Sequence, residues 1–276
     1  MTVQKVFQRR ELKYMLTRSQ HQALLKVMEP YMHLDEFGHS TIRNIYYDTD
    51  SFRLIRRSIE KPAYKEKLRI RSYRKATGTS TVFVELKKKY DHIVYKRRMT
   101  LPENEALEWL AGGEKPEDSQ IAREIEFFRD FYKELHPAMF LSYEREAYAP
   151  NPGSPMESGF RITFDENIRS RRDNISLDTE IWGDKVISDD SVLMEVKAFG
   201  GMPVWLTDFL TENHIFGTSF SKYGAAYTKF VLPEMTAGSR TLAYGRSGQA
   251  AAYRGYASAS GLNRSKKVRT ESYRYA

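Results

Sequence analysis

Charged residues alternate with aliphatic ones in one short segment, where Lys67, Arg69 and Arg71 flank Leu68 and Ile70. Successive side chains of a β-strand point to opposite faces, so the three cations would share one face and the aliphatic residues the other. Guanidinium groups match phosphate oxygens in a bidentate fashion, and lysine supplies a compact positive charge. The segment therefore predicts a strand with one face suited to a polyanion such as a phosphate chain.

The same alternation recurs in six further segments of the chain. On one face they carry Arg9, Glu11 and Lys13; Glu85 and Lys87; Lys96 and Arg98; Tyr143 and Arg145; Arg161, Thr163 and Asp165; and Glu195 and Lys197. A single antiparallel strand often turns a polar face to water, so one segment alone would mean little. Seven segments instead favour a charged concave side, with the apolar faces packed on helices. The acids offset only part of the positive charge, which indicates a bound polyanion.

Several common catalytic motifs are missing from the sequence. It has no GxxxxGK[ST] phosphate loop, no kinase-type glycine loop paired with an HRD segment, and no Ser-His-Asp hydrolase elbow. The absence of cysteine excludes disulfides, zinc–thiolate sites and a cysteine nucleophile, and the histidines lack the spacing of a zinc site. Acids on the charged faces are better metal ligands, because Mg²⁺ and Mn²⁺ prefer carboxylates together with phosphate oxygens.

The segments that would position these residues form a strand-rich order with interspersed helices. Strands are predicted at residues 6–15, 41–47, 65–73, 81–89, 92–101, 138–148, 160–167 and 191–199. Helices are predicted at residues 17–32, 51–59, 102–111, 119–135, 204–213 and 222–232. Short turns at residues 76–79 and 90–91 would join neighbouring strands as hairpins. Such connections favour an antiparallel α+β domain over a doubly wound parallel sheet.

The positive charge is unevenly distributed along the 276 residues, whose formal net charge is +8. Residues 237–276 hold eight Lys or Arg and one acidic residue, whereas residues 1–236 have a net charge of only +1. The terminal segment is rich in Gly, Ala, Ser, Arg and Tyr, so we predict a disordered basic tail after one domain of residues 1–236. The tail is either merely solvated, which we favour slightly, or attracts an anion such as nucleic acid.

Neither a membrane span nor a secretion signal is visible in the sequence. No apolar run approaches the roughly 18 residues of a membrane span, and the first residues lack the apolar core of a signal peptide. We therefore expect a cytoplasmic protein. The low net charge of residues 1–236 and the lack of a recognised motif argue against nucleic-acid binding outside the tail.

Short motifs across the chain, taken together, resemble the VTC-type polyphosphate polymerase domain. That domain is named for the vacuolar transporter chaperone complex and belongs to the triphosphate tunnel metalloenzymes, or CYTH-like proteins. The motifs are RRELKY at 9–14, KLRIR at 67–71, VFVELK at 82–87, YKRR at 95–98, SYER at 142–145, FRIT at 160–163, LMEVK at 193–197 and SKY at 221–223. Each is short, but they follow the order of the family across residues 6–230.

The resemblance implies a tunnel of eight antiparallel strands with flanking helices, whose basic lining holds a triphosphate. Carried over by motif, the residues implied to bind phosphate and assist its transfer are Lys13, Arg69, Arg71, Lys87, Lys96, Arg98, Arg145, Arg161 and Lys222. Further phosphate contacts are assigned to Lys67, Tyr143, Lys197 and Ser221, and the metal, Mn²⁺ or Mg²⁺, to Glu195. The implied reaction transfers the γ-phosphoryl group of ATP to a growing polyphosphate chain, with pyrophosphate as a primer. Family members often act with membrane partners, so a membrane-protein partner is implied as well.

The first strand departs from the wider group, because its hydrolases carry ExExK and this chain has Arg9-x-Glu11-x-Lys13. The lost acid weakens a two-metal arrangement of the hydrolase type. Glu11 is then either a metal ligand or, as we favour, an ion-pair partner of neighbouring cations. A hydrolase of triphosphate or nucleoside triphosphates, and a domain that only binds polyphosphate or nucleotides, are the alternatives to the polymerase. Water in place of the phosphate acceptor would convert transfer into hydrolysis.

Overall fold

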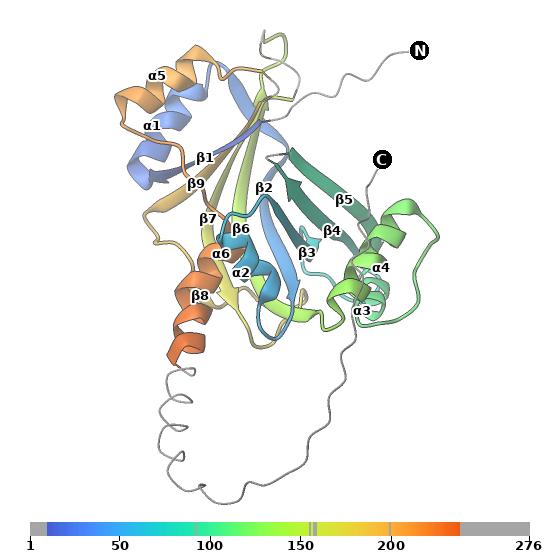
Figure 1. Cartoon of the computed structure of the whole chain (residues 1–276). Coiled ribbons are helices and arrows are strands. Elements are labelled where there is room, and N and C mark those ends of the chain that lie inside the picture. The colour runs from blue at the N-terminus through green and yellow to red at the C-terminus, as the bar shows by residue number, and fades with distance from the viewer. Residues whose placement is uncertain (1–9, 92, 155, 157–158, 199, 238–276) are drawn as a thin grey trace, which may run out of the picture. The chain divides into compact units, whose positions relative to one another are not determined.

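The computed structural model describes residues 10–91, 93–154, 156, 159–198 and 200–237. Its central feature is a nine-stranded antiparallel sheet with strand order β1-β9-β7-β6-β2-β3-β4-β5, and β8 pairs with β7 (Figure 1). The strands are β1 (Arg10–Thr17), β2 (Met32–Asp48), β3 (Tyr64–Ser72), β4 (Thr81–Tyr90), β5 (Ile93–Pro102), β6 (His136–Pro150), β7 (Arg161–Arg171), β8 (Asp184–Lys185) and β9 (Ser191–Ala198). The antiparallel α+β class is confirmed. Within the described residues no ladder joins β1 to β5, so hydrogen bonds do not close the sheet into a barrel.

Helices cover the apolar face of the sheet near both of its ends. The described helices are α1 (Arg18–Met28), α2 (Arg53–Ile59), α3 (Glu103–Leu110), α4 (Gln120–Tyr132), α5 (Val204–Glu212), α6 (Lys222–Ala226) and the π-helix η1 (Tyr227–Val231). Those on the apolar face are α1 and α5 at one end and α3 and α4 at the other. One buried core joins α1 and α5 to β1, β7 and β9 through side chains such as Leu24 and Leu206. A second core joins α3 and α4 to β3, β4 and β5 through side chains such as Trp109 and Val84. The predicted packing of apolar strand faces on helices is therefore confirmed.

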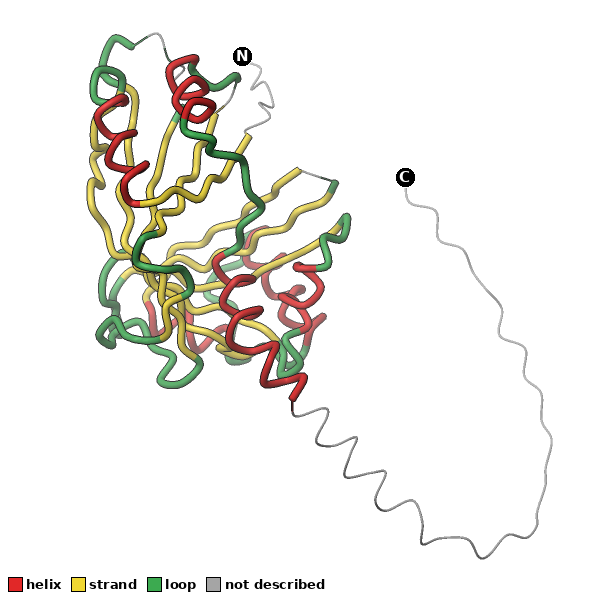
Figure 2. The backbone as a smooth tube through the Cα atoms, turned by 90° about the vertical axis from the view of Figure 1, so that its left-hand side faces the viewer, coloured by secondary structure: helices red, strands yellow, loops and turns green. Residues whose placement is uncertain are grey.

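The opposite face of the sheet is covered only in part, by α2 and α6. Figure 1 shows these two helices side by side, in front of the middle strands. Lys222 at the start of α6 forms an ion pair with Asp165 of β7, on the face that carries the alternating charges. Figure 2 shows that the strands change direction along the sheet, which is therefore strongly curved. Helix α6 therefore approaches the sheet on its charged face, where Lys222 contacts both Asp165 and Glu195.

Strand β2 is much longer than the strand predicted at residues 41–47. It begins at Met32, and its first half contains a register shift against β6 between Leu34 and His39. Gly38 lies within this shift and has a φ of 44°, in the left-handed region that glycine adopts without strain. Such an irregularity breaks the strict alternation that identifies a strand, so the sequence pattern does not reveal the first half of β2.

Two helices and one strand also differ from the prediction. Helix α1 ends at Met28, not near residue 32, because Pro30 cannot continue a helix. The helix predicted at residues 222–232 is divided between α6 and the π-helix η1. Strand β8 has only two residues, too few to leave a pattern in the sequence.

A buried carboxylate on β2 anchors α6. Asp48 has no solvent exposure and accepts backbone N–H bonds from Leu54 at 2.8 Å and Ile55 at 3.0 Å, where α2 begins. The hydroxyl of Tyr223 donates to the same carboxylate at 3.0 Å, and its ring stacks on Tyr46 with centroids 4.5 Å apart. Because Tyr223 is the second residue of α6, these contacts fix the start of that helix over the charged face.

Substitution Asp48→Ala is expected to lower the free energy of unfolding by about 2–4 kcal/mol, because it leaves several buried donors without an acceptor. Urea denaturation would measure the loss. The matched control is Asp208→Ala on α5, where the exposed side chain has no hydrogen bond or ion pair among the described residues, and where a change within about 0.5 kcal/mol is expected. Equal losses in the two variants would contradict the anchoring role of Asp48.

Candidate functional site

Cross-strand register brings the predicted cations together on one face. Lys13 on β1 lies opposite Glu195 on β9. At the other end of the sheet, Glu85 on β4 lies between Arg69 on β3 and Arg98 on β5. Strands β1 and β9 are far apart in the sequence, so alternation within each strand could predict the face of Lys13 and Glu195 but not their pairing.

Glu85 is the centre of one cluster of cations. Its carboxylate is 1% exposed and lies 2.7 Å from Arg69 Nη2, 2.6 Å from Lys96 Nζ and 2.6 Å from Arg98 Nη2, with Arg71 Nε at 3.9 Å. Burial alone would raise the pKa of Glu85, but the charges of Arg69, Arg71 and Lys96 outweigh it and hold that pKa well below its usual range. The carboxylate is therefore ionised and serves as the shared counter-ion of the cluster.

Asp165 and Glu195 are the centre of a second cluster. Arg145 donates to both oxygens of Asp165 at 2.5 and 2.6 Å, and Lys222 Nζ lies 2.5 Å from Asp165 and 3.1 Å from Glu195. Lys13 Nζ lies 3.0 Å from Glu195 and Arg145 Nη2 lies 3.2 Å from it. Burial would raise the pKa of Glu195, but Lys222, Lys13 and Arg145 hold it well below its usual range. Sequence reasoning placed Asp165 on this face but did not assign it to the site.

Tyr143 lies between the two clusters. Its hydroxyl accepts a hydrogen bond from Arg71 Nη2 at 3.2 Å. The guanidinium carbon of Arg145 lies 5.2 Å from the centre of the ring and Lys222 Nζ lies 4.5 Å from it. A ring face attracts cations without neutralising their charge, so the positive charge stays available to a bound anion.

Two of the predicted phosphate-binding lysines have no acidic partner. Lys67 Nζ donates to Ser221 Oγ at 2.7 Å, and Ser221 in turn caps α6 by accepting from the backbone N–H of Gly224 at 3.2 Å. Burial, followed by the charges of Lys87 and Lys65, lowers the pKa of Lys67 to about 7. Lys87 is exposed, and no carboxylate of the described residues lies within 4.0 Å of its amine. An anion bound between these lysines would supply the missing counter-charge.

The two ends of the sheet approach each other across the charged face. The charge of Lys13 on β1 contributes to the lowered pKa of Lys67 on β3. The pKa of Glu11 on β1 is lowered even though burial opposes the shift, and the largest opposing contribution comes from Lys87 on β4. Lys13 Nζ of β1 donates to the carbonyl oxygen of Phe220 at 3.0 Å, and Lys67 Nζ of β3 donates to the hydroxyl of the adjacent Ser221 at 2.7 Å. One short segment thus contacts strands toward both ends of the sheet, so the face is concave. Glu11 is an ion-pair partner, because Lys13 Nζ lies 3.5 Å from it.

Arg161 and Lys197 lie at the margin of this face. Arg161 Nη2 is 2.6 Å from the carboxylate of Asp35 on β2, and its guanidinium lies 5.9 Å from the ring of Phe37. Lys197 lies opposite Glu11 on β1 and contributes to the lowered pKa of that acid. Arg161 thus has its carboxylate partner on β2, outside the two central clusters. The structure thus gathers the other predicted residues and places these two toward one end.

The residues that could hold a divalent metal are Glu195, Asp165 and Glu11. Among the residues the structure describes, no group of three or more acidic or histidine side chains is arranged as a metal site. Lys13 Nζ forms ion pairs with both Glu195 and Glu11, so the lysine occupies the position between these acids that a metal ion would take. The carboxylates fit Mg²⁺ or Mn²⁺, but only if phosphate oxygens complete the coordination and draw Lys13 away.

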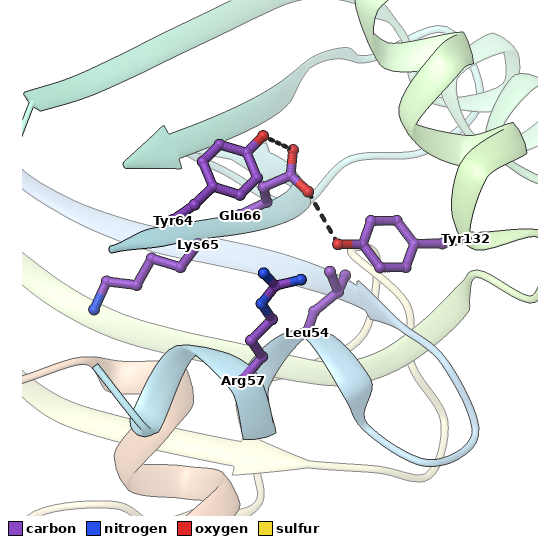
Figure 3. A pocket seen from close by; sticks show the side chains of 6 residues that line it. All are labelled: Leu54, Arg57, Tyr64, Lys65, Glu66 and Tyr132. Atoms are coloured by element: carbon purple, nitrogen blue, oxygen red, sulfur yellow. Dashed lines mark hydrogen bonds between the residues drawn. The ribbon is translucent and has the colours of Figure 1, made fainter. Parts of the chain in front are cut away.

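A separate pocket lies between β3, α2 and α4. Figure 3 shows Tyr64 and Tyr132 directed toward Glu66, whose carboxylate accepts a hydrogen bond from each hydroxyl, from Tyr132 at 3.0 Å. The polar atoms of these side chains satisfy one another, and Glu66 lies on the face opposite to Lys67. This pocket therefore joins α4 to the sheet and is separate from the candidate site.

Comparisons with known proteins agree with the geometry. A family model described as the VTC domain matches residues 8–231. An adenylyl cyclase candidate from Hippeastrum, described as having a dominant triphosphatase activity, is 21% identical with a TM-score of 0.50, over 81% of this chain and 97% of that one. An adenylate cyclase candidate from Bacillus halodurans is 18% identical with a TM-score of 0.48, over 80% and 96% of the two chains. A comparison with curated proteins found no match. At such identities the structural similarity to the Hippeastrum protein supports the fold alone.

Substitution Glu85→Gln is expected to lower the free energy of unfolding by about 3–5 kcal/mol, because several cations lose their buried counter-ion. The pKa of Glu85 is lowered in the folded state, so its contribution is present above the usual glutamate pKa and is lost as the pH falls below it. Urea denaturation at neutral and acidic pH would measure both effects. The control Glu124→Gln, which removes a half-buried partner of Arg97 near the surface, should cost less than about 1 kcal/mol. Similar losses in both variants would contradict the counter-ion role.

Binding of tripolyphosphate at about pH 8.5 is expected to take up as much as one proton at Lys67. With a pKa of about 7 this lysine is mostly neutral there, and a bound anion would raise its pKa and charge it. Near pH 6 it is charged in both states, so its contribution disappears. Calorimetric titrations in two buffers of different ionisation enthalpy would measure the uptake. The prediction fails if Lys67→Met takes up as many protons as the natural chain.

Proposed function

The chain belongs to the VTC domain family, and on that premise we propose that it is a metal-dependent polyphosphate polymerase that transfers the γ-phosphoryl group of ATP to a growing polyphosphate chain. The observation that carries the proposal is the excess of cations over carboxylates on one concave face. Two clusters hold their own counter-ions, whereas Lys67 and Lys87 have no acidic partner among the described residues. A linear condensed phosphate would supply negative charge along such a surface.

The proposed reaction requires little covalent chemistry from the protein. A terminal oxygen of the acceptor chain attacks the γ-phosphorus of ATP, a new P–O bond forms, and the bond to the β–γ bridging oxygen breaks to release ADP. Arg69, Arg71 and Arg145 would hold the transferring group in line and stabilise its charge, which is most of what phosphoryl transfer needs. Lys222 and Ser221, fixed by the anchored start of α6, would orient the phosphate at one end.

Glu195 would hold a Mg²⁺ or Mn²⁺ ion, with Asp165 beside it. A bound ion would supply positive charge that neutralises the charge developing on the leaving group. In the described structure both carboxylates bind Lys222 and Arg145 instead. We propose that phosphate takes over these cations on binding, which frees carboxylate oxygens for the metal.

A triphosphatase is the second candidate, because water could take the place of the acceptor chain on the same face. The similarity of fold to the Hippeastrum protein with its triphosphatase activity supports this alternative. Arg9 in place of the first acid of ExExK argues against it, since a two-metal hydrolase needs more carboxylates.

Partners and location are proposals of the same kind. ATP, pyrophosphate and polyphosphate are the proposed ligands, a cytoplasmic location is proposed from the sequence, and a membrane-protein partner is proposed from the family. Within the described residues, no helix has the length and apolar character needed to cross a bilayer. Most of the predicted basic tail, residues 238–276, lies outside the described residues, so its disorder and any nucleic-acid binding stay predictions.

Purified protein with ATP and Mn²⁺ or Mg²⁺, with and without pyrophosphate, is expected to form polyphosphate and to release one ADP for each phosphoryl group added to the chain. Polymer length on a gel and released ADP are the measurements. Arg69→Ala should reduce the rates of polymer formation and ADP release by about 100-fold, because it removes a positive charge positioned beside the transferring phosphoryl group. The control Arg97→Ala, on the other face of β5 and paired with Glu124, should change them by less than about twofold.

The other outcomes of this experiment separate the alternatives. Orthophosphate without polymer would identify a triphosphatase. Neither product, with ATP or polyphosphate still bound, would identify a binding domain. Glu195→Gln should raise the Mn²⁺ concentration needed for turnover and weaken Mn²⁺ binding in the presence of tripolyphosphate, as electron paramagnetic resonance would show. Unchanged Mn²⁺ binding would remove Glu195 from the metal site.

A further inference from the structure

Lysines lie directly opposite each other at one end of the β3–β4 ladder. Lys65 pairs with Lys89 and Lys67 pairs with Lys87 in the cross-strand register. Like charges placed directly opposite on one face destabilise a sheet. Lys65 and Lys89 lie outside the set of residues assigned to the site above, so that function leaves their pairing unexplained.

Lys65 belongs to the charged face. Figure 3 shows its side chain leaving β3 on the side opposite to Tyr64 and Glu66, which point toward α4. Its Nζ lies 3.4 Å from the carbonyl oxygen of Ser58 at the end of α2. Burial, followed by the charges of Lys89 and Lys87, lowers the pKa of Lys65. The lysines of the two rows are therefore close enough to repel one another.

In the described part of the chain, no carboxylate contacts the lysines at this end of the face, and Glu11 on β1 interacts with Lys87 only over a longer distance. Among the described residues, no carboxylate lies within 4.0 Å of the amines of Lys65, Lys67, Lys87 or Lys89, and Lys89 has no hydrogen bond. The next row along the ladder, where Arg69 faces Glu85, is compensated. Alternate residues of a strand are about 6.7 Å apart, so the Lys65–Lys89 row lies roughly 13 Å beyond the Arg69 row.

We propose that Lys65 and Lys89 form an additional subsite for a condensed phosphate chain, which holds phosphoryl groups beyond the triphosphate bound near Arg69. The ligand must be extended and charged throughout its length, because the uncompensated rows continue along the strands. The neighbouring residues on this face are Lys67, Lys87, Val94 and Lys96. None of these four has an aromatic ring on which a base could stack. A condensed phosphate thus fits better than a single-stranded nucleic acid. This inference rests on the proposed function and specifies its longer ligand.

The test compares binding of tripolyphosphate and of long-chain polyphosphate, without ATP or metal, to the full chain. Lys89→Ala combined with Lys65→Gln is expected to weaken long-chain binding about tenfold and to change tripolyphosphate binding by less than about twofold. The salt dependence of long-chain binding should become shallower as well, because fewer counter-ions are exchanged. Lys89→Ala alone, which removes no recorded hydrogen bond, should show a smaller loss in the same direction.

Lys88→Ala is the matched control. Lys88 is the neighbour of Lys89 on β4, and its charge lowers the pKa of Glu124 on α4, so its side chain lies on the other face of the sheet. The control also removes one lysine charge, and its affinities for tripolyphosphate and for long-chain polyphosphate should stay within about twofold of those of the natural chain. An unchanged thermal midpoint would show that each variant is folded.

Three results would overturn the subsite: equal losses for tripolyphosphate and long chains, an equal effect of Lys88→Ala, or no loss at all. The assignment of the ligand would be overturned if single-stranded RNA bound the natural chain as tightly as polyphosphate and lost as much affinity in the variant with both lysines replaced. Because the assay needs no turnover, a chain that binds polyphosphate through these lysines but forms no polymer would reject the polymerase and keep the subsite.

Discussion

Cations held on one face of a sheet repel one another, and the rest of this structure depends on how that repulsion is limited. Glu85 and the pair of Asp165 and Glu195 are buried where they each contact several cations at once. A buried carboxylate with several partners is stabilised more than an exposed ion pair, since solvent screens it less. Among the described residues no carboxylate contacts Lys67 or Lys87, so the charges of this face favour binding of an anion over maximal stability of the domain.

The helices on the apolar face of the sheet form its cores, whereas α6 on the charged face contributes residues to the candidate site. On the apolar face, α1, α5, α3 and α4 bury side chains such as Leu24 and Trp109, and these cores set the curvature and register of the strands. On the charged face, α6 adds Lys222 and Ser221, and its position depends on Asp48 through Tyr223. A long stretch of sequence separates the two partners of that contact, so the site is complete only when the end of the domain has folded back onto β2.

The sequence predicts the face of each strand well, because alternation is a local property. Lys67, Arg69 and Arg71 share a face as expected, and the antiparallel α+β class follows from the hairpins. The partners in the cluster of Asp165 and Glu195 could not be predicted, since they depend on register between strands that are distant in the sequence. Asp165 is the clearest case: it shares a face with Arg161 in sequence but binds Arg145 and Lys222 in space. The first half of β2 was missed for a different reason, because a bulge there interrupts the alternation.

One face can in principle support both transfer to a phosphate chain and hydrolysis, so the outcome depends on what occupies the acceptor position. A positioned acceptor has an effective concentration far above that of a free one, and this advantage is what lets it compete with water. Positioning needs contacts that do not also hold the donor. The compensated rows near Arg69 suit the donor, because a transferring group needs fixed charges around it. The lysines beyond them, which have no acidic partner among the described residues, would hold the polyphosphate chain through charge alone. Such contacts slow dissociation of the polyphosphate, yet they allow it to move along the lysines as each phosphoryl unit is added. On this argument, the separation of the two kinds of row along β3 and β4 is the property that favours a polymerase over a triphosphatase.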